Sequence, residues 1–93
     1  MTVYIGLGNA PAVIADRTQT ILQSAAQTFG GCSLTPVLGS WRSPAGDIVI
    51  EHSAQVVILG APAEAVTAWA LAVGRAFEQA AIMVDGEEIP CAA

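Results

Sequence analysis

The sequence predicts an α+β domain in which two helices lie on one face of a four-stranded antiparallel sheet. Two segments have apolar residues at helical spacing, and the segments around them have the alternation or the β-branched composition of strands. Their order is strand, helix, strand, strand, helix, strand. The 93 residues have the length of one domain, without internal repeats or low-complexity linkers, so we expect a single domain over residues 1–93.

The first strand and helix follow from local patterns. Thr2 to Leu7 alternates with period two, which places Tyr4 on the face opposite the apolar residues. A loop over residues 8–15 follows. The helix is predicted to begin at Asp16, a suitable N-cap, and to end at Phe29, before two glycines that can adopt the left-handed conformation.

The second and third strands form a predicted hairpin. Leu34 to Trp41 contains Pro36, which cannot donate to a strand ladder and therefore indicates an edge strand. Residues 43–46, Ser-Pro-Ala-Gly, have the composition of a tight turn. The third strand is predicted from Asp47 to Leu59, with a bend or bulge at Ser53 because the segment is too long to stay flat.

The second helix is predicted from Pro62 to Gln79, and the fourth strand from Ala81 to Val84. The ordered core then covers residues 2–84, and residues 85–93 form a polar tail. This order of elements predicts a ferredoxin-like βαββαβ sandwich. The apolar stripe of the second helix consists of Val66, Trp69, Ala70, Val73 and Phe77.

Apolar residues outnumber what a core of this size can bury. Of the residues, 54% are hydrophobic and 12% are charged, whereas a typical soluble domain has about 25% charged residues. Since monomers rarely expose large apolar patches, we expect the open face of the sheet to be covered by a second copy, forming a homodimer, or by another protein. The predicted interface residues are Tyr4, Val37, Trp41, Val57, Leu59 and Met83.

The two tryptophans have different expected roles. Trp69 lies in the helix stripe and belongs to the core. Trp41 lies beside a turn on an edge strand, where its large apolar area and single donor suit an interface anchor. The alternative is that Trp41 caps the end of the core.

The charge balance argues against nucleic-acid binding. The formal net charge is −5, and the chain has three arginines and no lysine. Three scattered cations cannot form the basic surface that phosphate contacts need. Residues 1–8 lack the regions of a secretory signal, and the longest apolar run is much shorter than the roughly 20 residues of a membrane span. These features predict a cytoplasmic protein without a membrane partner.

No catalytic constellation stands out, and the weak candidates lie in the hairpin. His52 is the only histidine, and it follows Glu51. The predicted hairpin brings Arg42 across from this pair, and an imidazole can act as a general acid or base near neutral pH. The alternative is that His52 is a strand residue whose ring is hydrogen-bonded to a neighbour.

No cofactor and no metal site are expected. Gly6 and Gly8 follow a strand, as in a dinucleotide-binding loop, but Pro11 stands where the third glycine of that fingerprint is required. Cys32 and Cys91 have neither metal-ligand nor CxxC spacing, and we expect two free thiols.

Four short motifs resemble those of a family of uncharacterised small bacterial proteins. That family has the order Gly-x-Trp, turn, Glu-x-Ser, strand, helix, Phe-x-Gln. The resemblance covers roughly residues 30–84 and implies the same fold without indicating an activity. This chain departs from the family in its few basic residues and its N-terminal loop. The motifs are Gly39-Ser40-Trp41, the turn Pro44-Ala45-Gly46, Glu51 with Ser53, and Phe77-Glu78-Gln79.

These observations leave three functions of different classes open. The leading prediction is a non-catalytic acidic protein-interaction module that self-associates through the open sheet face. The second is a phage or mobile-element inhibitor that occludes a basic surface of a host defence protein, as anti-CRISPR proteins do, for which the small size and the charge of −5 are suitable. The third is a small dimeric ferredoxin-like enzyme of unknown substrate, with its pocket between the sheet and the helices.

Overall fold

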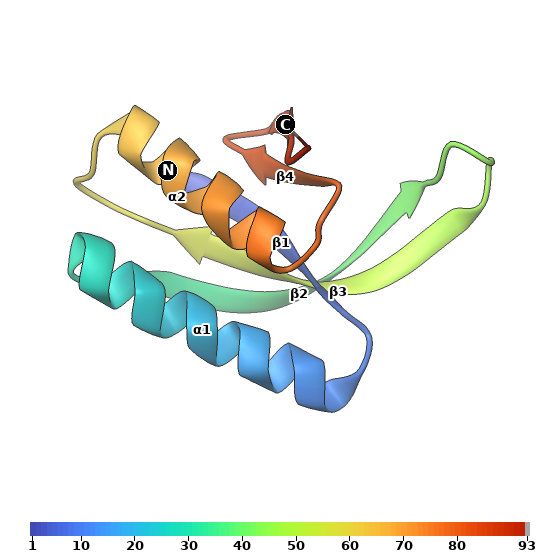
Figure 1. The fold of residues 1–93 in the computed structure, drawn as a ribbon, viewed down its shortest axis with the longest axis horizontal. Helices are drawn as coiled ribbons and strands as arrows, with labels where there is room; N and C mark the ends of the chain where they lie inside the picture. Colours follow the sequence, from blue (N-terminus) through green and yellow to red (C-terminus); the bar gives the residue numbers. More distant parts are fainter. Residues whose placement is uncertain (93) are drawn as a thin grey trace.

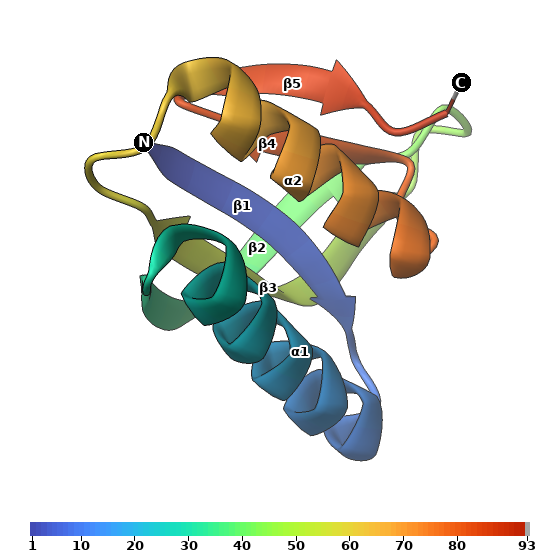
Figure 2. The same cartoon turned by 60° about the vertical axis from the view of Figure 1, so that its left-hand side comes forward.

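A computed structural model describes residues 1–92 of the chain. The elements are β1 (Thr2–Gly8), α1 (Pro11–Phe29), β2 (Ser33–Arg42), β3 (Ile48–Val57), α2 (Ala63–Ala76), β4 (Ala81–Val84) and β5 (Glu87–Pro90). The strands form one antiparallel sheet in the order β2-β3-β1-β4-β5, and both helices lie on the same face of it (Figures 1 and 2). Among the described residues, no helix is long and apolar enough to span a membrane.

The α+β class and the two helices are as predicted, but the sheet has five strands rather than four. The additional strand, β5, lies within the predicted polar tail and pairs with β4. Asp85 and Gly86 connect the two strands with positive φ angles of 47° and 83°, as a type I′ hairpin turn requires. A segment this short with few apolar residues gives no periodic signal. The last residue of the predicted tail, Ala93, lies outside the described residues.

The first helix begins at Pro11 rather than at the predicted Asp16. Proline is favoured at the first helical position because its missing N–H has no partner there in any helix. The N–H of Ile14 donates to the carbonyl oxygen of Ala10 at 2.9 Å and closes the first turn. The predicted end at Phe29 is confirmed, since α1 stops there and Gly30 adopts the left-handed conformation.

The core lies between the sheet and the two helices. Val3 and Ile5 of β1 are fully buried, as the alternation predicts. The predicted core position of Trp69 is also confirmed, and its Nε1 donates to the Ser24 hydroxyl of α1 at 2.9 Å. Phe29 packs edge-on against the same indole, with ring centroids 5.7 Å apart. The two helices are therefore joined to each other as well as to the sheet.

The β2–β3 hairpin extends past the helices (Figure 1). Since β2 is at the edge of the sheet, the edge position indicated by Pro36 is confirmed. The helices do not reach the far end of this hairpin, so the face that they cover elsewhere is uncovered there. On that face Leu38, Ile48 and Ile50 are 66%, 62% and 57% exposed. The apolar excess in the composition is therefore concentrated partly on this projecting hairpin.

The irregularity expected at Ser53 lies on the neighbouring strand instead. Gly6 pairs with Ser53, but the next pair is Gly8 with His52, so the register of β1 against β3 shifts by one residue. Gly8 has a φ of +76°, a conformation that glycine adopts without steric cost. The shift ends the regular pairing of β1 directly beside Glu51.

Candidate functional site

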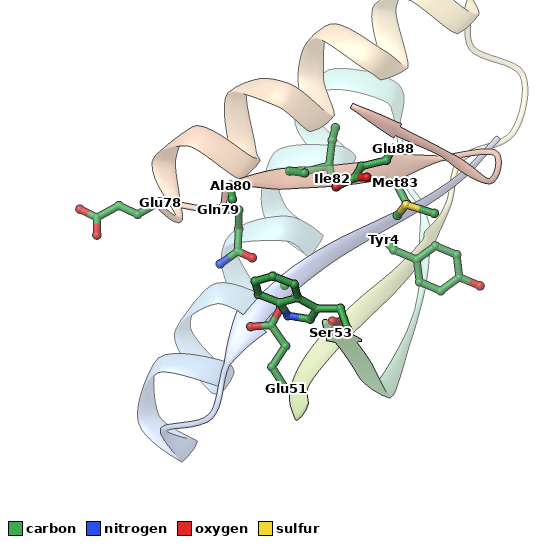
Figure 3. A pocket seen from close by; sticks show the side chains of 12 residues that line it. Tyr4, Glu51, Ser53, Glu78, Gln79, Ala80, Ile82, Met83 and Glu88 are labelled. Carbon is green, nitrogen blue, oxygen red and sulfur yellow. The ribbon is translucent and has the colours of Figure 1, made fainter. Parts of the chain in front are cut away.

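A cleft lies on the open face of the sheet (Figure 3). It has a volume of about 450 Å³. A second, more open hollow of about 480 Å³ continues from it over β2. The cleft is lined by Tyr4, Gly6, Trp41, Glu51, Ser53, Glu78, Gln79, Ala80, Ala81, Ile82, Met83 and Glu88.

Gly6 forms part of the floor. A β-carbon built on Gly6 would collide with the side-chain amide of Gln79 and would lie 2.9 Å from Oε1 of Glu51. Glycine at this position therefore leaves room for two polar side chains to meet over β1. In Figure 3, Gln79 descends from the chain segment before β4 and Glu51 rises from β3 toward it. A carboxylate and a carboxamide thus converge from elements far apart in the sequence.

Pairing with β2 also leaves space around the Glu51 side chain. Glu51 pairs with Gly39 of β2 in the ladder, so the adjacent strand places no side chain beside it. A β-carbon on Gly39 would come no closer than 3.9 Å to the Ser53 hydroxyl. Ser53, two residues along β3, projects from the same face as Glu51.

The end of α2 positions Gln79. The N–H of Gln79 donates to the carbonyl of Gly74 at 2.9 Å, and the N–H of Glu78 donates to that of Arg75 at 3.0 Å. These two bonds form a Schellman motif, in which the C′ residue is left-handed and is usually glycine. Here it is Glu78, with a φ of 57°. The helix therefore ends at Ala76, before the predicted Gln79, and the turn directs the Gln79 side chain over the sheet.

The walls of the cleft are aromatic and apolar, and its charged groups are acidic. Tyr4 and Met83 are neighbours across β1 and β4, and the Tyr4 hydroxyl accepts a hydrogen bond of 2.7 Å from Gln55. Trp41 is 45% exposed. Within residues 1–92 the lining includes three glutamates and no lysine, arginine or histidine. Such a site suits a positively charged ligand with an apolar or planar part.

The structure does not bring the three candidate catalytic residues together. Glu51 lines the cleft, but His52 follows it in β3, projects from the opposite face and is exposed. Arg42 is at the end of β2, exposed, and does not line the cleft. The site thus lies on the open face, whereas the enzyme hypothesis expected a pocket between the sheet and the helices.

The residues predicted for an interface mostly lie on the open face. Tyr4, Trp41 and Met83 line the cleft, and Val37 lines the hollow beside it. Val57 alternates with the buried Val56 and therefore also faces away from the helices. Leu59 lies in the loop after β3 and is 83% exposed.

Sequence reasoning did not select Gln79, Ser53 or Gly6 as functional residues. A signal for two of them was present, because the Glu-x-Ser and Phe-x-Gln motifs contain Ser53 and Gln79. Together with Trp41 of the Gly-x-Trp motif, these motifs contribute side chains to one cleft. The role of Gly6 could not be predicted from the sequence, because it depends on which side chains the fold places over it.

Comparison with known proteins relates the fold to one enzyme. No protein-family model matches the chain, and no curated protein matches it in sequence. Among solved structures, a phage SAM (S-adenosylmethionine) lyase in complex with S-methyl-5'-thioadenosine is similar, with a TM-score of 0.68 and 19% sequence identity. The similarity covers 96% of this chain and 86% of the lyase chain. At this identity the likeness is one of fold.

Proposed function

We propose that the cleft binds S-adenosylmethionine and cleaves it to release S-methyl-5'-thioadenosine. The observation that carries the proposal is the convergence of the Glu51 carboxylate and the Gln79 carboxamide over Gly6. A carboxylate can pair with the positively charged centres of this substrate. A carboxamide both donates and accepts hydrogen bonds, as recognition of a nucleoside requires.

The charge of the cleft favours this class of ligand. Glu51, Glu78 and Glu88 line it, and the whole chain carries a formal charge of −5. A negative field of this kind attracts a cation to the site. The substrate carries a sulfonium and an ammonium group, and the indole of Trp41 offers a ring face on which a cation is stabilised.

The cleavage step removes a charge, which the apolar walls favour. The substrate's own carboxylate attacks the γ-carbon of its amino-acid part as the bond from that carbon to sulfur breaks. The bonding electron pair stays on sulfur, so the sulfonium becomes the neutral thioether S-methyl-5'-thioadenosine, and the amino-acid part leaves as a five-membered lactone. Surroundings that exclude water favour a step in which charge disappears. Trp41 and Met83 supply apolar walls. The role of Glu51 is to bind and orient the cationic substrate rather than to stabilise its charge in the transition state.

The fold comparison supports the same substrate. The phage lyase shares the fold over most of both chains and holds S-methyl-5'-thioadenosine. The enzyme hypothesis drawn from the sequence therefore gains a substrate class, although of its three candidate groups only Glu51 lies in the cleft.

The test is product formation from S-adenosylmethionine, followed by chromatography and mass spectrometry. Wild-type protein is expected to release S-methyl-5'-thioadenosine. Glu51→Gln keeps the shape of the side chain and removes its charge. We expect it to weaken binding of the cationic substrate at least about tenfold, because a hydrogen bond to a charged group contributes roughly 1.5–3 kcal/mol.

The matched control is Glu87→Gln, which makes the same charge change on β5 outside the cleft. It should leave turnover within about twofold of wild type, as expected for a screened surface charge. Wild-type protein that neither forms the product nor binds it in calorimetry would contradict the proposal.

The second candidate is self-association, with or without catalysis. The observation that favours it is the bare hairpin, where Leu38, Ile48 and Ile50 are more than half exposed. Monomers rarely leave such residues in contiguous patches. Trp41 is 45% exposed on the opposite face of the same hairpin, the open face through which the sequence predicts self-association. The inhibitor hypothesis, in which another protein provides this cover, is an alternative outcome of the same test.

Light scattering across a concentration series tests self-association. Wild-type protein is expected to form a homodimer or larger assembly at micromolar concentration. Ile50→Glu should dissociate an assembly formed through the bare side of the hairpin, and Trp41→Asp should dissociate one formed through the open face. Val13→Glu on α1, which is also an exposed apolar position, should not. A wild-type monomer at every concentration would exclude self-association and leave a foreign partner to be tested by affinity capture.

A further inference from the structure

The side chain of Asn9 makes two hydrogen bonds to the main chain of β3, beyond the end of regular pairing with β1. Its Nδ2 donates to the carbonyl oxygen of Ile50 at 3.0 Å, and its Oδ1 accepts from the N–H of His52 at 3.3 Å. These two main-chain groups lie on either side of Glu51. The Asn9 side chain therefore holds β3 at both peptide units that flank the acidic residue of the cleft.

The need for these bonds follows from the bulge in β1. After the register shift between Gly6 and Gly8, the main chain leaves the sheet and enters α1 at Pro11. Without another partner, β3 would present unpaired N–H and C=O groups beside Glu51. The carboxamide of Asn9 has the same donor and acceptor as a peptide unit, and it continues the ladder by one more pair.

The other side of β3 is already fixed, because Glu51 pairs with Gly39 in the β2 ladder. With Asn9 in place, the backbone at Glu51 is held from both edges, and the carboxylate stands over Gly6 beside Gln79. Asparagine suits this task better than its nearest relatives. Aspartate lacks the donor for Ile50, and alanine lacks both groups.

We propose that Asn9 is a positioning residue that acts through Glu51 to make the cleft selective for a cationic ligand. This inference rests on the proposed function, in which Glu51 binds the positive charge of the substrate. Asn9 itself is exposed and outside the lining of the cleft. Its effect is therefore indirect, through the placement of the carboxylate.

The experiment compares two ligands that differ in charge. One is the nitrogen analogue of S-adenosylmethionine, with a protonated amine in place of the sulfonium, and the other is S-adenosylhomocysteine, which keeps the amino-acid part and has an uncharged thioether at that position. Calorimetry gives the affinity ratio of the cation to the neutral ligand. We expect Asn9→Ala to lower this ratio at least about threefold, and Glu51→Gln to lower it at least about tenfold.

The double variant Asn9→Ala/Glu51→Gln should have the same ratio as Glu51→Gln alone, because residues that act through one group are not additive. The matched control is Ser43→Ala. It removes another side-chain-to-backbone bond of the hairpin, the 3.2 Å bond from the Asp47 N–H, and should leave the ratio unchanged. Equal loss of both ligands in Asn9→Ala, or an additive double variant, would overturn the inference.

A second measurement separates failure of this inference from failure of the proposed function. In Asn9→Ala, the amide of His52 should exchange with solvent about 3- to 10-fold faster, since it loses its bond to Oδ1. Carboxyl NMR should show a changed chemical shift for Glu51 without any ligand. If wild type binds neither ligand, the proposed function fails, while the exchange rate and the shift still decide whether Asn9 positions Glu51. Unchanged values of both would reject that role.

Discussion

Gly74 and Gly6 each allow a close neighbour, one beneath α2 and the other in the cleft on the open face. A β-carbon at Gly74 would lie 2.7 Å from Cγ2 of Ile82 and 2.8 Å from Sγ of Cys91, both buried. At Gly6 the neighbours are the ends of long polar side chains. Packed atoms cannot move aside at Gly74, whereas the side chains over Gly6 can. The same residue type thus serves stability on the covered face and the site on the open face.

The largest expected effect is that of Gly6→Ala on turnover. The added methyl group displaces Gln79 and Glu51, and a misplacement of about 1 Å can reduce a rate about 100-fold. We expect product formation to fall by about 10- to 100-fold, with a change in unfolding free energy below about 1 kcal/mol. Turnover assays and chemical denaturation measure the two quantities.

The control for this variant is Gly39→Ala, also in a strand on the open face. Its β-carbon would meet nothing closer than 3.9 Å, so turnover should stay close to wild type. If both variants lose activity equally, crowding over Gly6 is not the cause.

Gly74→Ala should have the opposite pattern, with a loss of stability and no effect on the cleft. Overpacking costs about 1–3 kcal/mol, and alanine regains about 0.8–1 kcal/mol of helix propensity, so we expect a net loss of up to roughly 2 kcal/mol. Binding of S-methyl-5'-thioadenosine by the folded protein should not change. Chemical denaturation and calorimetry test this. In Gly74→Ala/Cys91→Ala the loss should be smaller than the sum of the single losses, and strict additivity would contradict a clash with Sγ.

Glu78→Gly should stabilise the protein. Glu78 is left-handed at the end of α2, a conformation that costs a residue with a β-carbon about 1–2 kcal/mol, partly offset by the greater freedom of glycine when unfolded. We expect a gain of up to about 1 kcal/mol in unfolding free energy. Glu78→Ala removes the carboxylate but keeps the strained conformation, so it should show no gain. A gain in both variants would point to charge repulsion instead.

The smallest expected effect concerns alkaline pH. Burial raises the pKa of the Cys91 thiol, and the nearby Arg75 partly offsets this. The folded protein therefore keeps this proton to higher pH than the unfolded chain, whose thiols ionise near pH 8.5. Unfolding free energy should decline as pH rises from about 8.5 through the folded pKa. Denaturation of reduced protein between about pH 8 and 9.5 should show a weaker decline in Cys91→Ala.

The covered face was more predictable than the cleft. Val3 and Ile5 follow from alternation, and Trp69 follows from helical spacing, because burial on one face is a periodic property. The enzyme hypothesis assigned Glu51 and His52 to one site, which is wrong because consecutive strand residues project from opposite faces. Gln79 could not be placed from its neighbours, because its direction depends on the left-handed conformation of Glu78.

By itself, the sequence determined the α+β class, the order of both helices and the first four strands, and which residues of β1 and α2 are buried, since these depend on local periodicity. Tertiary structure alone decided that β5 joins the sheet, that Asn9 bonds to β3, and that Glu51 meets Gln79 over Gly6. Each of these is a contact between separate elements. Such contacts are fixed by strand register and by single backbone conformations, which leave no repeating pattern along the chain.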